Sequence, residues 1–168
     1  MNKTQDALSA ENDLQDIPAL VERAKQEWEA TADALPQLVC LLDDQKRILR
    51  VNRTVERWEM AQVTDVKGQN IHELFHPGCT DPDCYLDTFW HQAWEELARG
   101  RSAECEARDE ILKRHLHVQV QPIATTTDKL RETAASYAAV VVHDITARKR
   151  IEKQLRQQKR LAAVGQLA

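Results

Sequence analysis

The ten residues 137–146, YAAVVVHDIT, decide the fold of this chain. They form a run of small and β-branched apolar residues that ends at Asp144, Ile145 and Thr146. Residues 147–168 follow, a highly charged segment without proline. A short apolar run of this kind is typical of a buried strand, and a charged segment without proline is typical of a helix. The stretch therefore predicts the last strand of a sheet, joined directly to a helix.

Four earlier segments predict the other strands. Residues 114–123, RHLHVQVQPI, alternate apolar with polar side chains, as half-buried antiparallel strands do. Residues 102–111, SAECEARDEI, alternate small apolar with charged side chains. Residues 37–43 and 47–52 are separated by a polar turn, which predicts a β-hairpin. Together with the last strand, these segments predict a five-stranded antiparallel sheet.

The remaining segments predict helices. In residues 17–35 the apolar side chains recur every three or four positions, and Pro36 ends the predicted helix. Residues 53–75 predict short helices and turns, and residues 85–99 predict an amphipathic helix. Residues 1–16 are polar and acidic, and we expect them to be disordered or frayed. The middle helices would cover one face of the sheet, which makes the predicted fold class α+β.

Residues 147–168 carry a narrow apolar seam in an otherwise charged helix. The seam consists of Ile151, Leu155, Leu161 and Val164. Such a narrow seam usually needs a partner helix, so the segment predicts a coiled coil in a parallel homodimer. The same segment holds seven basic residues and one acidic residue, which we attribute to a solvated helix face rather than to a nucleic-acid contact.

Composition limits the class of protein. With 168 residues, of which 42% are hydrophobic, the chain is long enough for one domain with helical extensions. Its polar beginning does not fit a signal peptide, and no apolar run approaches the roughly 18 residues of a membrane span. We therefore expect a cytoplasmic segment. Only four glycines occur and no GKS or GKT motif is present, so an enzyme that uses nucleotides by itself is not expected.

The order of these elements resembles a PAS domain. The resemblance covers about residues 26–150, and it is carried by RILRVN after the first strand, by Gly68 before IHELFHP, and by a final strand that runs into DITARKRIEKQL. Its most specific element is the group Asp144, Ile145 and Thr146. In this family the strand-to-helix junction at that place connects the sheet to an outgoing signalling helix.

The end of the chain is similar to part of another protein class. Residues 160–168, RLAAVGQLA, resemble the opening of the dimerisation and phosphoacceptor helix of a bacterial two-component sensor histidine kinase, with the phosphorylated histidine expected a few residues further on. This resemblance implies a PAS domain over residues 36–146 between an N-terminal helix, 17–35, and a signalling helix, 147–168. It also implies a parent chain that is an ATP-dependent histidine kinase with a response regulator as partner.

The loop at residues 76–84, HPGCTDPDC, places His76, Cys79 and Cys84 close together. Their spacing is near that of short zinc or iron loops. Three further residues are candidates for a fourth ligand: His72, Asp81 and His91. The two thiols would instead form a reversible disulfide if the turn brings their backbones close enough. A third interpretation is a stiff turn whose thiols only pack.

The four cysteines are expected to differ in accessibility. Cys79 and Cys84 belong to a loop rich in proline, aspartate and glycine, which predicts an exposed turn. Cys40 and Cys105 occupy inward positions of predicted strands, where free cysteines usually pack in the core. We therefore expect the loop pair to react first with an alkylating agent.

Aromatic residues and one histidine suggest further ligands. The aromatic residues that would line an apolar pocket, or simply form the core, are Trp58, Phe75, Phe89, Trp90 and Trp94. The resemblance to PAS domains implies haem b as another candidate cofactor, because some members bind haem iron through a histidine on the long helix. His91 is the histidine on that predicted helix. The candidate cofactors are thus zinc or another metal, haem b, or none.

The resemblance to PAS domains implies a sensory domain rather than an enzyme. We expect it to detect a cytoplasmic cue, either redox, metal or a small ligand, and to transmit the signal through a dimeric helix that controls autophosphorylation of the parent kinase. One alternative is a dimerisation module without a ligand. Another is a thiol-redox or metal-dependent activity at the loop from His76 to Cys84.

Overall fold

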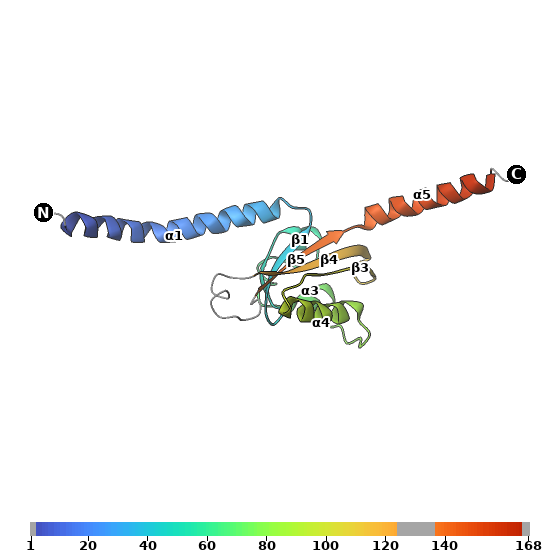
Figure 1. Ribbon diagram of the computed structural model, residues 1–168, viewed down its shortest axis with the longest axis horizontal. Helices are drawn as coiled ribbons and strands as arrows, with labels where there is room; N and C mark the ends of the chain where they lie inside the picture. The colour runs from blue at the N-terminus through green and yellow to red at the C-terminus, as the bar shows by residue number, and fades with distance from the viewer. Residues whose placement is uncertain (1–2, 124–136, 166–168) are drawn as a thin grey trace. The chain divides into compact units, whose positions relative to one another are not determined.

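The computed structural model describes residues 3–123 and 137–165, with side chains for residues 18–123 and 137–162 (Figure 1). The chain divides into two compact units, residues 1–35 and residues 36–168. Each unit is considered by itself below.

The first unit is a single helix, α1 (Lys3–Asp33), which contains Pro18. Our expectation that residues 1–16 are disordered or frayed was wrong for residues 3–16, which are helical. This stretch lacks a wide apolar stripe, but eight of its fourteen residues are alanine, leucine, glutamine, glutamate or lysine, which all favour a helix. Residue propensity, rather than amphipathic pattern, therefore accounts for the longer helix.

The second unit holds a sheet and helices that pack on it. Within the described residues, the elements in chain order are β1 (Leu38–Asp43), β2 (Ile48–Val51), α2 (Thr54–Arg57), α3 (Ile71–Phe75), α4 (Tyr85–Ala98), β3 (Ala103–Asp109), β4 (Arg114–Ile123), β5 (Tyr137–Asp144) and α5 (Thr146–Gly165). The strand order across the sheet is β2-β1-β5-β4-β3, and all neighbours are antiparallel. The predicted five-stranded antiparallel sheet is confirmed, and β5 lies at its centre.

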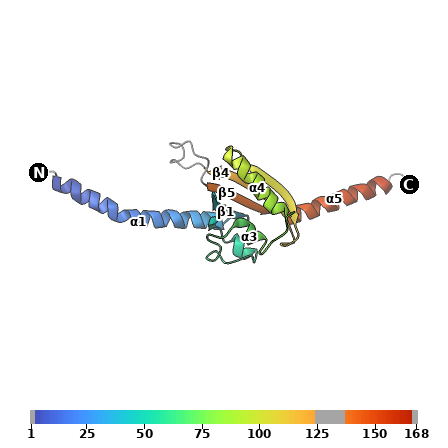
Figure 2. The same ribbon diagram turned by 90° about the horizontal axis from the view of Figure 1, so that it is seen from below.

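One face of the sheet builds the core. Cys40, Val140 and Val120 lie side by side across β1, β5 and β4, and all three are buried. They belong to the same buried cluster as one stripe of α4, which lies along the sheet (Figure 2), and the stripe consists of Leu86, Phe89, Trp90, Ala93 and Leu97. Because side chains alternate along a strand, a register slip of one residue would move the buried side chains to the other face.

A buried asparagine joins the first two strands. The Asn52 side chain is 1% exposed and follows β2 directly. Its Oδ1 accepts a hydrogen bond from the Val39 N–H at 3.0 Å, and its Nδ2 donates to the Gln37 carbonyl at 2.9 Å. Both polar ends of the side chain are therefore satisfied, as a buried amide requires. This gives the RILRVN motif a structural role at the start of β1.

No helix in the described part of the chain combines the length and the apolar character needed to cross a membrane.

Candidate functional site

His72 lies on the short helix α3, and His76 follows the helix directly as its C-cap residue, one turn further along the chain. The helix begins at its cap Asn70, whose Oδ1 accepts a hydrogen bond from the His72 N–H at 2.8 Å. The His76 N–H in turn bonds to the His72 carbonyl at 2.8 Å. Positions that are four residues apart share one face of a helix, so both imidazole rings project on the same side, with ring centroids 5.4 Å apart.

A tight turn then brings Cys79 back towards the two histidines. Gly78 has a φ of +67°, a left-handed conformation that glycine adopts without strain, and its N–H donates to Glu73 Oε1 at 2.9 Å. Asp81 accepts a hydrogen bond from the Asp83 N–H at 2.9 Å, which shapes the approach to α4. Cys84 is the residue that caps the beginning of α4.

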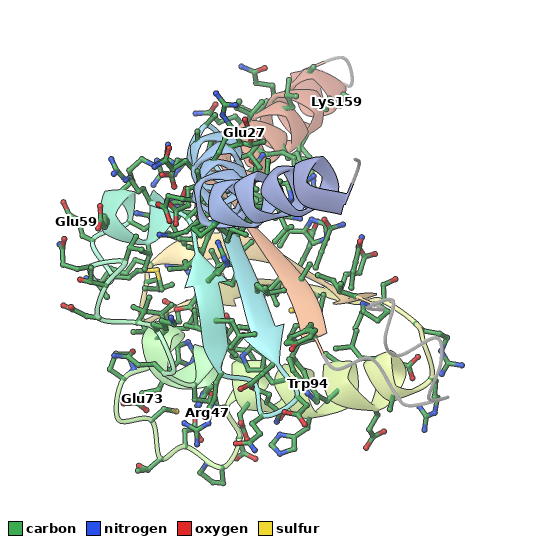
Figure 3. The ribbon with its side chains drawn as sticks, turned by 90° about the vertical axis from the view of Figure 1, so that its left-hand side faces the viewer. Glu27, Arg47, Glu59, Glu73, Trp94 and Lys159 are labelled. Carbon is green, nitrogen blue, oxygen red and sulfur yellow. The ribbon has the colours of Figure 1, made fainter. Side chains whose placement is uncertain are left out.

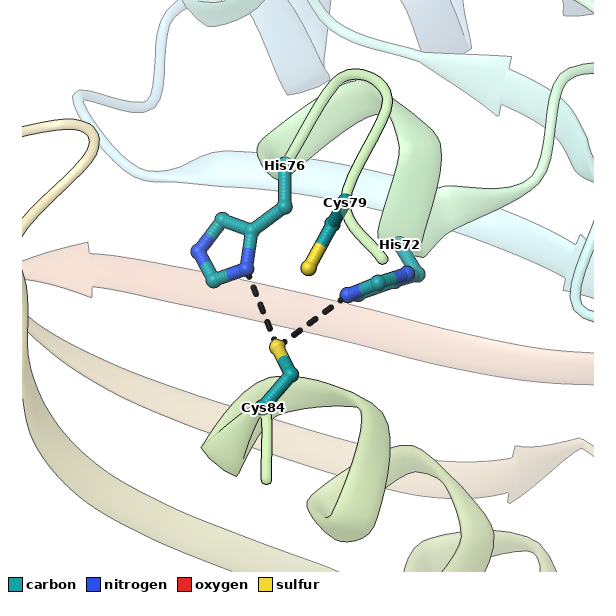
Figure 4. Close-up of side chains that lie close together, drawn as sticks. All are labelled: His72, His76, Cys79 and Cys84. Carbon is teal, nitrogen blue, oxygen red and sulfur yellow. Dashed lines mark hydrogen bonds between the residues drawn. The ribbon is translucent and has the colours of Figure 1, made fainter. Parts of the chain in front are cut away.

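The four side chains of His72, His76, Cys79 and Cys84 converge on one point (Figure 4). One ligand atom from each, a ring nitrogen or a sulfur, lies within 4.8 Å of the other three. His72 Nε2 and His76 Nδ1 are both 3.2 Å from Cys84 Sγ. His76 and Cys84 are buried, whereas His72 and Cys79 are partly exposed. We call these four residues the His2Cys2 cluster.

Asp109 supports the cluster from the end of β3. Its carboxylate is fully buried, and Oδ2 accepts hydrogen bonds from His76 Nε2 at 2.8 Å and from the Tyr85 hydroxyl at 2.7 Å. Its Oδ1 accepts from the N–H groups of Ile111 and Leu112 at 2.9 and 2.8 Å. The carboxylate therefore fixes the orientation of the His76 ring and leaves Nδ1 of that ring facing the cluster.

Burial and hydrogen bonding act on the ionisable groups of the site. Burial opposes ionisation of Asp109, but hydrogen bonds from the Leu112 N–H, His76 and Tyr85 outweigh it and lower the pKa of the carboxyl. Burial raises the pKa of the Cys84 thiol, and the nearby backbone N–H groups of Asp87 and Leu86 offset only part of that effect. The buried Asp109 is thus an anion, and Cys84 is not a thiolate activated for attack.

The structure brings together three of the four predicted site residues. His76, Cys79 and Cys84 meet in the cluster, but His91 lies on the solvent side of α4, where its Nδ1 is 2.9 Å from the Asp87 carbonyl and its side chain is 66% exposed. Among the three candidates for a fourth ligand, the structure therefore places His72 in the cluster. The spacing His-x3-His on a helix was the sequence signal for it. The exposed position of His91 also gives no support to a haem ligand there.

Three of the predicted pocket aromatics form the core instead of lining an open pocket. Phe75, Phe89 and Trp90 are buried in the main hydrophobic cluster. Among the buried side-chain nitrogen and oxygen atoms in the described part of the chain, Trp90 Nε1 is the one without a hydrogen-bond partner. An unpaired buried N–H costs about 1–3 kcal/mol.

The other two aromatics lie at the border of the core. The Arg114 guanidinium lies 5.1 Å from the centroid of the Trp58 ring. Trp94 projects from α4 beside the strands, and its Nε1 donates to the Asp44 carbonyl at 2.9 Å (Figure 3). Both rings pack against the core while their polar contacts face its edge.

The predicted accessibility of the cysteines needs a correction, because Cys84 is only 5% exposed. Its position at the beginning of α4 turns the thiol into the cluster rather than towards solvent. In the chelator-treated chain we expect iodoacetamide to label Cys79 first and Cys40 last. Burial raises the pKa of Cys40 to about 12 and that of Cys105 to about 11, so neither is a thiolate at neutral pH.

Peptide mapping of the labelled chain over time would measure this order. The same chain in denaturant is the control, and its four thiols should react at similar rates. Rapid labelling of Cys40 in the folded chain would contradict the strand register of β1.

The predicted signal junction connects the sheet to α5 through direct hydrogen bonds. The Ile145 N–H donates to the His115 carbonyl at 2.8 Å, and the His115 N–H donates to Thr146 Oγ1 at 2.9 Å. Asp144 accepts from Arg114 at 2.5 Å and, through Oδ1, from the Thr146 N–H at 2.9 Å. The first turn of α5 is thereby attached to the beginning of β4.

Glu106 of β3 adds a second attachment. Its two carboxylate oxygens lie 2.6 Å from Arg148 Nη2 and 2.7 Å from Lys149 Nζ, both on α5. Hydrogen bonds from Lys149 and Arg148 lower the pKa of the Glu106 carboxyl, so it is charged near neutral pH. Movement of the β3–β4 hairpin would therefore act on α5 at two places.

Solved structures with the same fold include domains of sensor histidine kinases. A sensory box sensor histidine kinase from Vibrio cholerae aligns with a TM-score of 0.50 at 16% identity, over 77% of this chain and 98% of that one. The PAS domain of BvgS from Bordetella pertussis aligns with a TM-score of 0.52 at 18% identity, over 82% and 98%. The photoactive yellow protein domain of the sensor histidine kinase Ppr from Rhodospirillum centenum aligns with a TM-score of 0.50 at 19% identity, over 69% and 92%. At these identities the likeness shows the fold alone.

The sequence comparisons identify the family. A search of curated proteins found no match. The family described as PAS fold matches residues 32–150, which is more than half of the chain. The match includes the His2Cys2 cluster, Asp109 and the junction at Asp144. The chain therefore belongs to the PAS fold family.

Proposed function

We propose that this chain is a cytoplasmic sensory PAS domain of a two-component histidine kinase. It detects a redox, metal or small-ligand cue and transmits the signal through a dimeric α5 to control autophosphorylation of downstream domains, which pass the phosphate to a response regulator. Its fold is similar to that of sensor domains from histidine kinases, which supports this assignment. The segment itself is not catalytic in this proposal.

The observation that carries the proposal is that one hairpin touches both the cluster and the signalling helix. Asp109, at the end of β3, binds His76 of the cluster. Arg114, its partner across the β3–β4 register, binds Asp144 at the junction. A change in the cluster that shifts Asp109 would therefore reach the junction through two adjacent residues. Such a switch also requires the cue to bind two states of the domain with different affinity.

The exposed seam of α5 supports a dimeric output helix. Ile151, Leu155 and Leu161 are more than half exposed, so their apolar surface is available to a partner helix. The side chain of Val164, the fourth predicted seam residue, lies outside the described residues. A parallel partner helix would bury the three described side chains and place two signalling helices side by side.

The test is autophosphorylation of a fusion in which the full chain precedes the dimerisation and ATP-binding domains of a histidine kinase. Glu106→Gln removes the charge that holds Arg148 and Lys149, so the junction loses one of its two attachments. We expect the rate of phosphate incorporation to change by at least about fivefold, the lower end of typical couplings between sites.

Glu110→Gln is the matched control, because it makes the same change of charge on the same hairpin but Glu110 pairs with Arg108 rather than with α5. Equal rates for the wild type and both variants would contradict transmission through the junction and favour the dimerisation module without a ligand. The chain without the kinase domains should incorporate no phosphate.

The alternative of thiol-redox chemistry at the loop has one specific observation in its favour. The sulfur atoms of Cys79 and Cys84 lie within 4.8 Å of each other, so a modest shift would allow a disulfide. Mild oxidation that links these two residues and changes the kinase rate would favour a redox cue.

A further inference from the structure

We propose that the His2Cys2 cluster is a zinc site, in which His72 Nε2, His76 Nδ1 and the sulfurs of Cys79 and Cys84 bind one Zn²⁺ tetrahedrally, with Asp109 as the positioning residue for His76. Zinc would then be the ligand at the site of the proposed function. A role of zinc as the cue rests on that proposed function. The binding of zinc itself does not depend on signal transmission.

The distances between the ligand atoms fit a tetrahedral zinc ion. Zinc lies about 2.3 Å from cysteine sulfur and about 2.0 Å from histidine nitrogen, which puts a nitrogen and a sulfur of one tetrahedron about 3.5 Å apart. The two nitrogen-to-sulfur distances to Cys84 are both 3.2 Å. The largest separation among the four atoms is no more than 4.8 Å. Shifts of an ångström or less would complete the geometry.

The hydrogen bond to Asp109 selects the nitrogen of His76 that faces the cluster. The Asp109 carboxylate accepts hydrogen bonds and donates none, so His76 Nε2 carries the proton and Nδ1 presents its lone pair. Histidine ligands of metals usually make this kind of hydrogen bond through the second ring nitrogen. The arrangement of carboxylate, imidazole and open lone pair is thus already built.

The charge of the site suits a divalent cation. When zinc binds, the two thiols release their protons to solvent and two Zn–S bonds form. The two thiolates then balance the charge of Zn²⁺, since the two imidazoles are neutral. The partly buried site therefore holds no net charge apart from that of Asp109. Zinc prefers such a nitrogen and sulfur set, whereas magnesium and calcium prefer oxygen.

A disulfide between Cys79 and Cys84 accounts for fewer of the four side-chain positions than a zinc ion does. Linking Cys79 to Cys84 would use both sulfurs but leave His72 Nε2 and His76 Nδ1 pointing at a group that neither donates nor accepts strongly. A hydrogen-bonded network without a metal would have the Cys84 thiol donate to His76 Nδ1 and His72 Nε2 donate to the same sulfur, which is a weak acceptor and a weak donor. One zinc ion pairs with all four atoms at once.

The burial of the ligands gives an entry route. His76 and Cys84 form the inner side of the site, whereas His72 and Cys79 are partly exposed at its outer side. A metal ion can therefore approach through the loop without opening the core. The outer pair is also the better target for substitution, since its removal leaves the core packing intact.

The experiment measures metal content and affinity in the full chain. Purified chain is reduced, stripped with a chelator and titrated with Zn²⁺ in competition with a chromophoric chelator, and Co²⁺ serves as the spectroscopic probe. We expect one Zn²⁺ per chain and, with Co²⁺, the ligand-field bands of a tetrahedral site together with thiolate charge-transfer absorption. His72→Gln and Cys79→Ser should each weaken zinc binding by at least about 100-fold.

His91→Gln and Cys105→Ser are the matched controls, because each removes the same kind of side chain away from the cluster, and both should bind zinc as the wild type does. Asp109→Asn should weaken zinc by about 10- to 100-fold while the Co²⁺ spectrum keeps the intensity expected for two thiolates. A role of Asp109 in folding alone would leave the zinc affinity of the folded chain unchanged.

The outcomes separate this inference from the proposed function. The zinc site would be overturned if the reduced chain binds less than one-tenth of a zinc ion. Equal zinc affinities for the wild type, His72→Gln and Cys79→Ser would also overturn it. If the chain forms a Cys79–Cys84 disulfide and has no affinity for zinc, the loop would be assigned to redox chemistry. One zinc per chain with a kinase fusion that does not respond to zinc would leave the site in place and remove zinc as the cue.

Discussion

Replacement of Asp109 by leucine is expected to lower the free energy of unfolding of the metal-free chain by about 3–5 kcal/mol, the usual effect of breaking a buried charged pair. The carboxylate is fully buried and accepts four hydrogen bonds, from His76, Tyr85, Ile111 and Leu112. Leucine has a similar volume but no acceptor, so these four donors would lose their partner. A loss of this size is a large part of the 5–15 kcal/mol that holds a typical domain folded.

Urea unfolding in the presence of a chelator, followed by circular dichroism and by tryptophan fluorescence, would measure the change. Glu110→Leu is the matched control, because the adjacent carboxylate is exposed and pairs only at the surface with Arg108. Its expected effect is within about 0.5 kcal/mol. If Asp109→Leu unfolds at the same urea concentration as the wild type, Asp109 does not hold His76 in place. The His76 ring is then not oriented for a metal ion before the ion binds.

The architecture could be predicted from the sequence because side-chain periodicity is a local property. Each predicted strand differs from the observed one by at most two residues at either end, and the alternation in residues 114–123 assigns Leu116, Val118 and Val120 to the core correctly. The helical residues 3–16 could not be predicted from an apolar stripe, since helix propensity alone favours them. The pattern of apolar and polar side chains therefore predicts secondary structure where a segment has one buried face.

The candidate site could be predicted only in part, because its residues come from segments that the fold brings together. His76, Cys79 and Cys84 are neighbours in sequence and were found, whereas Asp109 lies 33 residues from His76. One signal for Asp109 was available. It continues the series of inward positions Ala103, Cys105 and Ala107 on β3, and an acidic residue in such a position needs a buried partner.

The burial of Cys84 shows a second limit. Turn-forming residues predict that a loop lies at the surface, but they do not predict where each side chain points. The loop turns back on itself at Gly78 and ends at Cys84, which is the N-cap residue of α4. Its thiol is thus directed inward even though the loop as a whole is exposed, which is also what joins it to the two histidines.

Leu155→Glu is expected to convert a dimer of this chain largely into monomer. A buried leucine contributes about 1.5–3 kcal/mol, and a symmetric dimer contains the side chain twice. Placing two carboxylates in the seam would add repulsion, so the dissociation constant should rise by at least about 100-fold, which corresponds to about 2.8 kcal/mol. Sedimentation velocity over a range of protein concentrations would measure the shift.

Arg156→Gln is the matched control for this variant, because it also makes the chain more negative by one charge while altering an exposed position of α5 outside the seam. It should leave the dimer intact. If Leu155→Glu remains as dimeric as the wild type, α5 does not form the interface, and the exposed apolar residues Leu20, Val21 and Trp28 of α1 become the candidates. In that case a cue could not act by restacking paired α5 helices, and the signal would have to leave the PAS domain by the contacts of Glu106 and Arg114 within a single chain.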